Sequence, residues 1–236
     1  MLTRALQELG YDFREFLISP QQLNIPNSRL RYYLIARRKA SERTCFPFSN
    51  EVIHEQLPQL NFECDLCDSR WKSHYRQTKE PLTSFIERLT HEQTVKHALS
   101  DNVLDKYSIV FDIVTENSLN SCCFTKGYRQ LFKGTGSILQ ENSTIVTTDY
   151  FNELPRYEDD SSSKASALRI EKLKLLKLRY FTPREVANLM CFPSTFSFPK
   201  EVTEKQMYKV LGNSVNIDVV STMLRYLLYA NMVENE

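Results

Sequence analysis

The sequence has little of what several protein classes require. It holds only 5 glycines in 236 residues, which leaves few for the glycine-rich loops that cradle phosphates. It holds no apolar run near the ~20 residues that cross a bilayer, and its first residues lack the apolar core of a signal peptide. Its 6 cysteines are too few and too irregularly placed for a secreted disulfide framework. We therefore expect an intracellular protein that does not contact membranes.

A strong charge of one sign is also absent, because 30 Lys and Arg residues oppose 29 Asp and Glu residues. This balance excludes neither a nucleic acid nor a small substrate, since binding of a polyanion depends on where the positive charges lie. They gather in residues 29–43 and again in residues 169–184. Charge alone favours two solvated faces over a binding site.

The hydrophobic share of 42% is sufficient for a buried core. Apolar spacing predicts a helix over residues 2–9 that ends at Gly10, and strands over 13–18 and 32–36. The second strand is an almost continuous apolar run, which is typical of a strand buried on both faces of a helix-covered sheet. The N-terminal region therefore predicts an α/β fold.

Later segments are mostly helical by pattern. We expect a helix over 81–89, a strand or loop over 103–114, an exposed linker over 153–163 and a leucine-rich helical stretch over 168–178. Thr182, Pro183 and Glu185 form a capping-box start for a helix that should reach about Met190. A closing helix with a broad apolar face follows over 215–230.

Metal and nucleotide motifs are weak. Cys64 and Cys67 have Cys-x-x-Cys spacing, and the possible further ligands are Cys45, His54 and His74. Structural zinc generally needs four ligands, usually as two close pairs, so we expect no metal. Gly134 and Gly136 lack a third glycine, and this pattern predicts a turn instead of a nucleotide loop.

Three separated segments carry a family resemblance when they are taken in order. They are Asn27-Ser28-Arg29-Leu30-Arg31-Tyr32, Cys122-Cys123-Phe124-Thr125-Lys126-Gly127-Tyr128 with Gly134-Thr135-Gly136-Ser137, and Arg179-Tyr180-Phe181-Thr182-Pro183-Arg184-Glu185 with Leu211-Gly212-Asn213-Ser214-Val215-Asn216. Together they resemble the C-terminal half of the tRNA cytosine-5 methyltransferases of the DNA-methyltransferase fold. Cys-Phe-Thr resembles the tRNA-acting branch in particular.

The resemblance implies a partial class I, Rossmann-like methyltransferase sheet with an inserted target-recognition domain and a C-terminal closing helix. It divides the chain into catalytic-domain strands over 1–39, the target-recognition domain over 40–199, and a return segment with the closing helix over 200–236. A complete doubly wound sheet does not fit, because each βαβ unit needs ~30 residues.

The implied function is methylation of cytosine 38 in the anticodon loop of tRNA, with S-adenosyl-L-methionine as methyl donor and the cytosine flipped out of its stack. The implied location is the cytoplasm and the nucleus. Two alternatives stay open: a DNA cytosine-5 methyltransferase and a non-catalytic RNA-binding module.

Several family segments are missing from this sequence. It has neither the Phe-x-Gly-x-Gly loop for the methyl donor, nor the Pro-Pro-Cys-Gln loop with the nucleophile, nor the Glu-Asn-Val segment with the acid. We therefore expect a truncated form with an incomplete donor pocket, which binds nucleic acid but does not turn over alone. A chain that supplies the N-terminal half is a possible partner.

By the resemblance, Arg29 and Arg31 are catalytic residues. Strand alternation places both on one face, where guanidinium groups can donate to a base carbonyl and a nearby phosphate. The alternative is an exposed pair at a strand start. Asn213, Ser214 and Val215 resemble positions that line the methyl-donor pocket, in the loop before the closing helix, and their alternative role is helix capping.

The nucleic-acid-binding candidates combine donors, positive charge and aromatic rings in a stretch without acids. They are Cys123, Phe124, Thr125, Lys126, Tyr128 and Lys133. Unpaired RNA bases stack on aromatic rings, and phosphates pair with lysine or arginine. The alternative is that Phe124 and Tyr128 belong to the core and that Cys123 is a small buried hydrophobe. By the resemblance, Cys123 is not the methyl-transfer nucleophile.

Overall fold

The computed structural model describes residues 2–38, 52–57, 76–152 and 163–229. The chain divides into two compact units, which we call the split unit (1–79 with 215–236) and the central unit (80–214). These bounds differ from the division at 39/40 and 199/200 that the resemblance implies, and that functional division stays a prediction. No helix in the described ranges is long and apolar enough to cross a membrane.

The split unit combines a small mixed sheet with two helices. Its elements are α1 (Leu2–Glu8), β1 (Tyr11–Ile18), the 3-10 helix η1 (Pro20–Leu23), β2 (Arg31–Arg38), β3 (Ile53–His54) and α8 (Ile217–Tyr229). The strand order is β2-β1-β3, with β1 antiparallel to β2 and parallel to β3. Gly10, at φ +74°, lets the chain turn from α1 into β1. The predicted first helix, both strands and the closing helix are confirmed.

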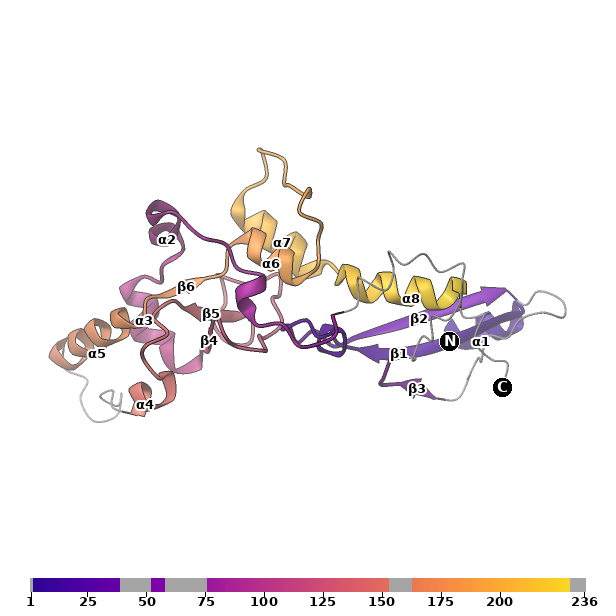
Figure 1. Ribbon diagram of the computed structural model, residues 1–236, viewed down its shortest axis with the longest axis horizontal. Coiled ribbons are helices and arrows are strands. Elements are labelled where there is room, and N and C mark those ends of the chain that lie inside the picture. The colour runs from indigo at the N-terminus through magenta and orange to yellow at the C-terminus, as the bar shows by residue number, and fades with distance from the viewer. Residues whose placement is uncertain (1, 39–51, 58–75, 153–162, 230–236) are drawn as a thin grey trace. The chain divides into compact units, whose positions relative to one another are not determined.

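The core of the split unit forms where α8 packs against β2 and η1 (Figure 1). Phe16 on β1 meets Tyr226 on α8 edge to face, with ring centroids 6.1 Å apart. Within β2 only Ile35 is fully buried, and Tyr32 is 46% exposed. The expectation that this strand is buried on both faces is therefore wrong for the described part of the split unit. An apolar run shows what a strand could bury, but its neighbours decide what it does bury.

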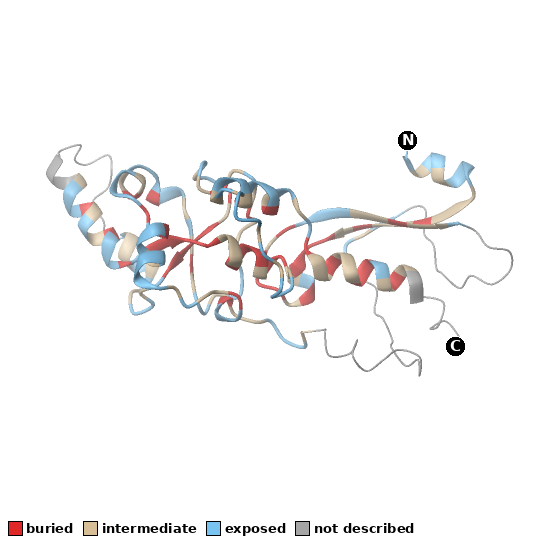
Figure 2. Cartoon of the chain, turned by 90° about the horizontal axis from the view of Figure 1, so that it is seen from above, coloured by how far each residue is buried: buried red, intermediate tan, exposed pale blue. Residues whose placement is uncertain are grey.

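The central unit surrounds a second three-stranded sheet with short helices. Its elements are η3 (Leu82–Ser84), α2 (His91–His97), α3 (Asp101–Tyr107), η4 (Ser108–Val110), β4 (Asp112–Thr115), β5 (Ser137–Gln140), α4 (Thr147–Asn152), α5 (Ser163–Leu175), β6 (Leu178–Tyr180), α6 (Pro183–Leu189) and α7 (Glu204–Asn213). The strand order is β4-β5-β6, with β5 parallel to β4 and antiparallel to β6. Every residue of β5 and β6 is buried (Figure 2).

Three segments of the central unit differ from the sequence predictions. Residues 81–89 hold only the short turn η3, and a helix begins after Thr90, where Thr90 and Gln93 form a capping box. The segment 103–114 is helical up to Val110 before it becomes β4. Helix α7 was not predicted, although Thr203 and Gln206 provide the same capping-box signal. The expected linker at 153–163 lies almost wholly outside the described residues.

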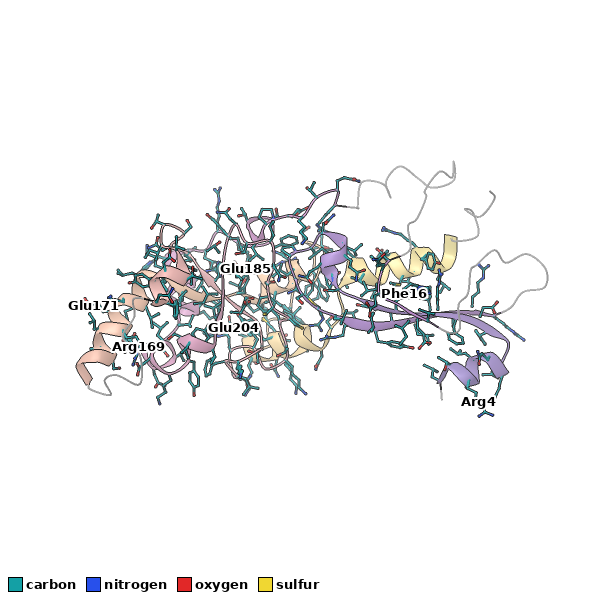
Figure 3. The ribbon with its side chains drawn as sticks, turned by 90° about the horizontal axis from the view of Figure 1, so that it is seen from below. Arg4, Phe16, Arg169, Glu171, Glu185 and Glu204 are labelled. Carbon is teal, nitrogen blue, oxygen red and sulfur yellow. The ribbon has the colours of Figure 1, made fainter. Side chains whose placement is uncertain are left out.

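The predicted start of α6 is confirmed, and it adjoins a buried ion pair. Thr182 Oγ1 accepts from the Glu185 amide at 3.1 Å, and Glu185 accepts from the Thr182 amide at 2.7 Å. Glu185, labelled in Figure 3, is fully buried, and both of its carboxylate oxygens accept from Arg179 at 2.8 Å. Arg179 also donates to Glu141 at 2.6 Å. The family-like segment 179–185 therefore forms a charged centre of the core.

Candidate functional site

The loop from Thr125 to Thr135 carries two of the predicted binding residues, Lys126 and Lys133. We call it the lysine loop. The Thr125 amide donates to the Thr135 carbonyl at 2.9 Å and closes the loop at its base. Inside it, the amides of Gln130 and Leu131 both donate to the Gly127 carbonyl at 2.9 Å. These bonds give the loop a defined shape within the central unit.

Gly212 in α7 lies directly against the backbone of the lysine loop. A Cβ at this position would lie 2.1 Å from the Lys126 nitrogen and 2.3 Å from the Thr125 carbonyl carbon. Only a hydrogen fits there, so no other residue allows the same approach of helix and loop. The structure thus brings together two of the family-like segments, Cys-Phe-Thr-Lys and Leu-Gly-Asn-Ser, although they are far apart in the sequence.

Phe124 and Tyr128 are core residues, with exposures of 3% and 2%. The ring of Phe124 lies 5.0 Å from those of both Tyr128 and Phe181, centroid to centroid. The Tyr128 hydroxyl donates to the Ser137 carbonyl at 2.7 Å and accepts from the Phe181 amide at 2.9 Å. Burial raises the pKa of Tyr128 well above its usual value. The prediction that these two rings offer stacking surfaces is therefore wrong: both rings are buried in the core on which the lysine loop packs.

The glycine pair after the lysine loop forms the predicted turn. Gly134 has φ +67° and Gly136 has φ +148°. A Cβ on Gly136 would lie 2.7 Å from carbon atoms of both the Phe124 and Tyr128 rings. This close packing explains why a glycine is needed at the exit of the loop.

The two cysteines before the loop are half-buried and reduced. The thiol of Cys123 points to the Phe124 carbonyl at 3.9 Å. Burial, together with the nearby carboxylate of Asp112, raises the pKa of Cys122 to about 11. Cys122 is therefore a neutral thiol at physiological pH, which makes it a poor nucleophile.

Lys126 and Lys133 are exposed, and in the described part of the chain no carboxylate lies within ion-pair distance of either. Two other surface lysines of the central unit are paired: Lys174 with Asp101 at 2.8 Å and Lys96 with Glu204 at 3.2 Å. The positive charge of the lysine loop is therefore available to an external anion.

The arginines of the positive stretch 169–184 do not form such a surface. Arg169, labelled on α5 in Figure 3, pairs with Asp105 at 2.8 Å and is 6% exposed. Arg179 is buried with its carboxylates, and Arg184 donates to the carbonyls of three residues, Phe192, Pro193 and Phe196. The three arginines thus make internal contacts of the unit, whereas Lys174 and Lys177 are exposed, so the predicted solvated face is confirmed for these lysines only.

Arg29 and Arg31 lie in the split unit at the entrance to β2. Arg29 is 2% exposed and its amide donates to Ser19 Oγ at 3.1 Å, whereas Arg31 is exposed and donates to the Leu30 carbonyl at 2.7 Å. Burial raises the pKa of Tyr33, and the charges of both arginines oppose that shift. Arg29 precedes β2 and is buried, whereas Arg31 is its exposed first residue, so the expected placement of both on one strand face is not shown. Their catalytic role stays a prediction.

Asn213 is the last residue of α7, and Ser214 caps that helix at its C-terminal end, its amide donating to the Leu211 carbonyl at 3.0 Å. The predicted loop placement is therefore wrong for Asn213, which is helical, and right for Ser214, which lies between α7 and α8. The first turn of α8 is capped by Asn216, whose side chain accepts from the Val219 amide at 3.2 Å. Asn213 and Val215 are exposed, so this corner does not enclose a methyl donor by itself.

Most of the possible metal ligands, namely Cys45, Cys64, Cys67 and His74, lie outside the described residues. His54 is described on β3, where its Nε2 accepts from Arg14 Nε at 3.0 Å. Burial and the Arg14 charge lower the pKa of His54. In the described ranges no group of three or more potential ligands gathers.

A family profile described as C-5 cytosine-specific DNA methylase matches residues 1–228. The chain therefore belongs to the cytosine-5 methylase family, which uses S-adenosyl-L-methionine. Its mixed α/β fold matches solved structures of that family.

Curated relatives include two tRNA (cytosine(38)-C(5))-methyltransferases. That of Rattus norvegicus is 33% identical, and the match covers 96% of this chain and 66% of the relative. That of Spodoptera frugiperda is 37% identical, and the match covers 94% of this chain and 59% of the relative. A crystal structure of a Spodoptera frugiperda DNMT2 mutant has a TM-score of 0.76 at 34% identity, covering 95% of this chain and 60% of that one. S. pombe Dnmt2 gives a TM-score of 0.68 at 33% identity, covering 97% and 61%. The chain thus spans roughly six-tenths of these relatives.

Proposed function

We propose that this chain is the substrate-recognition part of a tRNA cytosine-5 methyltransferase acting on cytosine 38 of the anticodon loop. The main structural support for this proposal is the contact of Gly212 with the Thr125–Lys126 backbone. It fixes the segment that resembles the tRNA-acting branch against the end of α7. The adjoining lysines are exposed, so an RNA phosphate can pair with them.

In this proposal Arg29 and Arg31 stabilise charge on the target cytosine. Guanidinium groups offer fixed donors, which suit the negative charge that develops on a cytosine ring during attack at its carbon 6. The two residues lie two positions apart at the start of β2, which supports a common site for the two charges. Asn213, Ser214 and Val215 contribute one corner of the donor pocket.

The isolated chain binds tRNA but does not transfer methyl groups, because the nucleophile loop and most of the donor pocket are not in its sequence. Methyl transfer requires these segments of the N-terminal half of the family fold. The protein acts in the cytoplasm and the nucleus, where such tRNA is present.

The test measures two properties of the full 236-residue chain. Tritium transfer from labelled S-adenosyl-L-methionine to tRNA should be absent for the chain alone and should appear when the N-terminal part of a curated relative is added. A tRNA with uridine at position 38 is the control acceptor. Transfer by the chain alone would refute the no-turnover proposal.

Binding of the same chain to tRNA and to duplex DNA, measured at several salt concentrations, separates the main alternatives. We expect tighter binding to tRNA with a steep salt dependence. Equal or tighter binding to DNA would favour the DNA cytosine-5 methyltransferase, to which a relative named in Dictyostelium discoideum is 30% identical. Binding of tRNA with no transfer under any complementation would favour a non-catalytic RNA-binding module.

A further inference from the structure

A stacked aromatic pair lies where the lysine loop meets α3. Phe132 of the loop and Tyr107, the last residue of α3, have ring centroids 4.2 Å apart and an interplanar angle of 24°. Phe111 lies beside Phe132, with centroids 6.4 Å apart. Phe132 thus has two aromatic neighbours, whereas Tyr107 is 37% exposed. Tyr107 is the ring of this group with the most open surface.

This group differs from the other aromatic cluster of the central unit. Phe124, Tyr128 and Tyr208 are each at most 3% exposed and meet edge to face. That arrangement fills a core. Tyr107 instead stacks one ring face on Phe132 and is 37% exposed, and an exposed tyrosine ring is a surface on which an unpaired nucleotide base can stack.

The charges around the exposed pair suit a polyanion. Lys106 and Lys133, the sequence neighbours of Tyr107 and Phe132, are exposed, and the described residues place no carboxylate within ion-pair distance of them. Two acids of α3 are paired, Asp105 with Arg169 and Asp101 with Lys174, whereas Asp112 is exposed, accepts from the Ser137 hydroxyl and keeps its negative charge. Positive charge beside a stacking surface favours RNA over an acidic protein or a purely apolar partner.

We infer that Tyr107 is a stacking site for an unpaired nucleotide of the RNA whose phosphates pair with the lysine loop. This rests on the proposed function and extends its contact surface beyond the cytosine-recognition segments. The loop links the two places, because its Thr125–Lys126 end contacts Gly212 while its Phe132 contacts Tyr107. One nucleotide stacks on Tyr107, and the adjoining phosphates lie near Lys106 and Lys133.

The test compares Tyr107→Leu with Tyr107→Phe in the full chain, using fluorescent tRNA and a fluorescent single-stranded oligouridylate. Loss of one stacked base should weaken RNA binding by about ten-fold in Y107L, whereas Y107F should bind as the native chain does. The salt dependence should be unchanged in Y107L, because no phosphate contact is lost. Ile109→Ser removes an 80% exposed apolar side chain in the same turn and should leave RNA binding unchanged.

Each outcome decides one claim. If tRNA binds and Y107L binds it equally well, the stacking site is refuted while the proposed function stands. If oligouridylate binding depends on Tyr107 but tRNA does not bind, the stacking site is supported and tRNA is refuted as the substrate. If neither RNA binds, both the stacking site and the proposed function are refuted. An equal loss in Y107L and I109S would refute the stacking site, because the effect would not be specific to the Tyr107 ring. Should Y107L not fold, cross-linking of 4-thiouridine-substituted RNA to the native chain tests the same claim, since absence of a cross-link in the peptide that contains Tyr107 would refute it.

Discussion

The central unit and the split unit differ in how they place their candidate functional residues relative to their cores. The central unit buries Arg179 with Glu185 and keeps Phe124 and Tyr128 beneath the lysine loop. In the split unit, Leu30 and Tyr32 remain 56% and 46% exposed around the start of β2. The central unit therefore positions its candidate binding loop with its own core. The split unit has a core of its own around Phe13 and Phe16, but it leaves Arg31, a candidate catalytic residue, exposed at the start of β2; single exposed apolar side chains occur in both units.

The largest effect should follow from breaking the buried ion pair of the central unit. Arg179→Ala leaves the carboxylate of Glu185 buried without its charge partner, so we expect a loss of about 3–5 kcal/mol in unfolding free energy. Urea denaturation followed by hydrogen exchange should show the loss in peptides of the central unit. Arg4→Ala, which removes an exposed pair with Glu8, is the control and should leave stability unchanged. Similar stability of the two variants would contradict the contrast between the units.

Gly212→Ala should separate α7 from the lysine loop. The new methyl group would overlap the Lys126 backbone, so we expect a cost of about 1–3 kcal/mol and weaker tRNA binding. Gly10→Ala is the matched control: its φ of +74° makes alanine unfavourable by about 1–2 kcal/mol, but no atom lies within 4 Å of the new Cβ. It should lower stability without an effect on tRNA binding, as filter binding would show. Native tRNA affinity in G212A would show that the contact between Gly212 and the lysine loop does not support tRNA binding.

The lysine loop should contribute affinity without stability. Lys126→Ala and Lys133→Ala each remove an exposed charge, and each should reduce the slope of log affinity against log salt by about 1 if it contacts one phosphate. Lys174→Ala, in an exposed pair with Asp101, is the control and should keep the slope. Unchanged slopes in both loop variants would exclude the loop as the RNA contact.

The smallest effect concerns acid stability. Burial alone would raise the pKa of Glu204, but Lys96, Arg129 and His97 together lower it below its usual 4.5. A carboxylate whose folded-state pKa is depressed contributes stability above its unfolded pKa and loses it as the pH falls through the folded pKa. The central unit should therefore lose part of its stability below about pH 4.5. Glu204→Gln should flatten this dependence in thermal melts between pH 3 and 7, and an unchanged pH profile would show that the carboxylate does not contribute.

Much of the fold follows from signals between neighbours in the chain. The first helix, the hairpin strands, the capped start of α6 and the closing helix were predictable because each depends on a few adjacent residues. Helix α7 was missed although its Thr203-x-x-Gln206 cap was present. The segment 103–114 was misjudged, because a short apolar stretch fits a strand and a helix equally well.

The candidate site was predictable in its residues but less so in its geometry. Lys126 and Lys133 are exposed, as binding requires, whereas Phe124 and Tyr128 are core. An aromatic residue has the same pattern in either role, since its burial depends on segments such as 178–181 and 208–211 that pack on it. Tyr107 was not a candidate, because its stacking on Phe132 joins residues 25 positions apart.

By itself, the sequence determined the family-like motifs, the helix caps and the balance of charge, because these depend on which residues stand next to one another. Only the tertiary structure decided that Gly212 contacts Lys126, that the arginines of 169–184 face inward, and that Tyr107 stays open. The reason is that burial and close approach arise between segments distant in the chain, where packing excludes water and atoms compete for the same space.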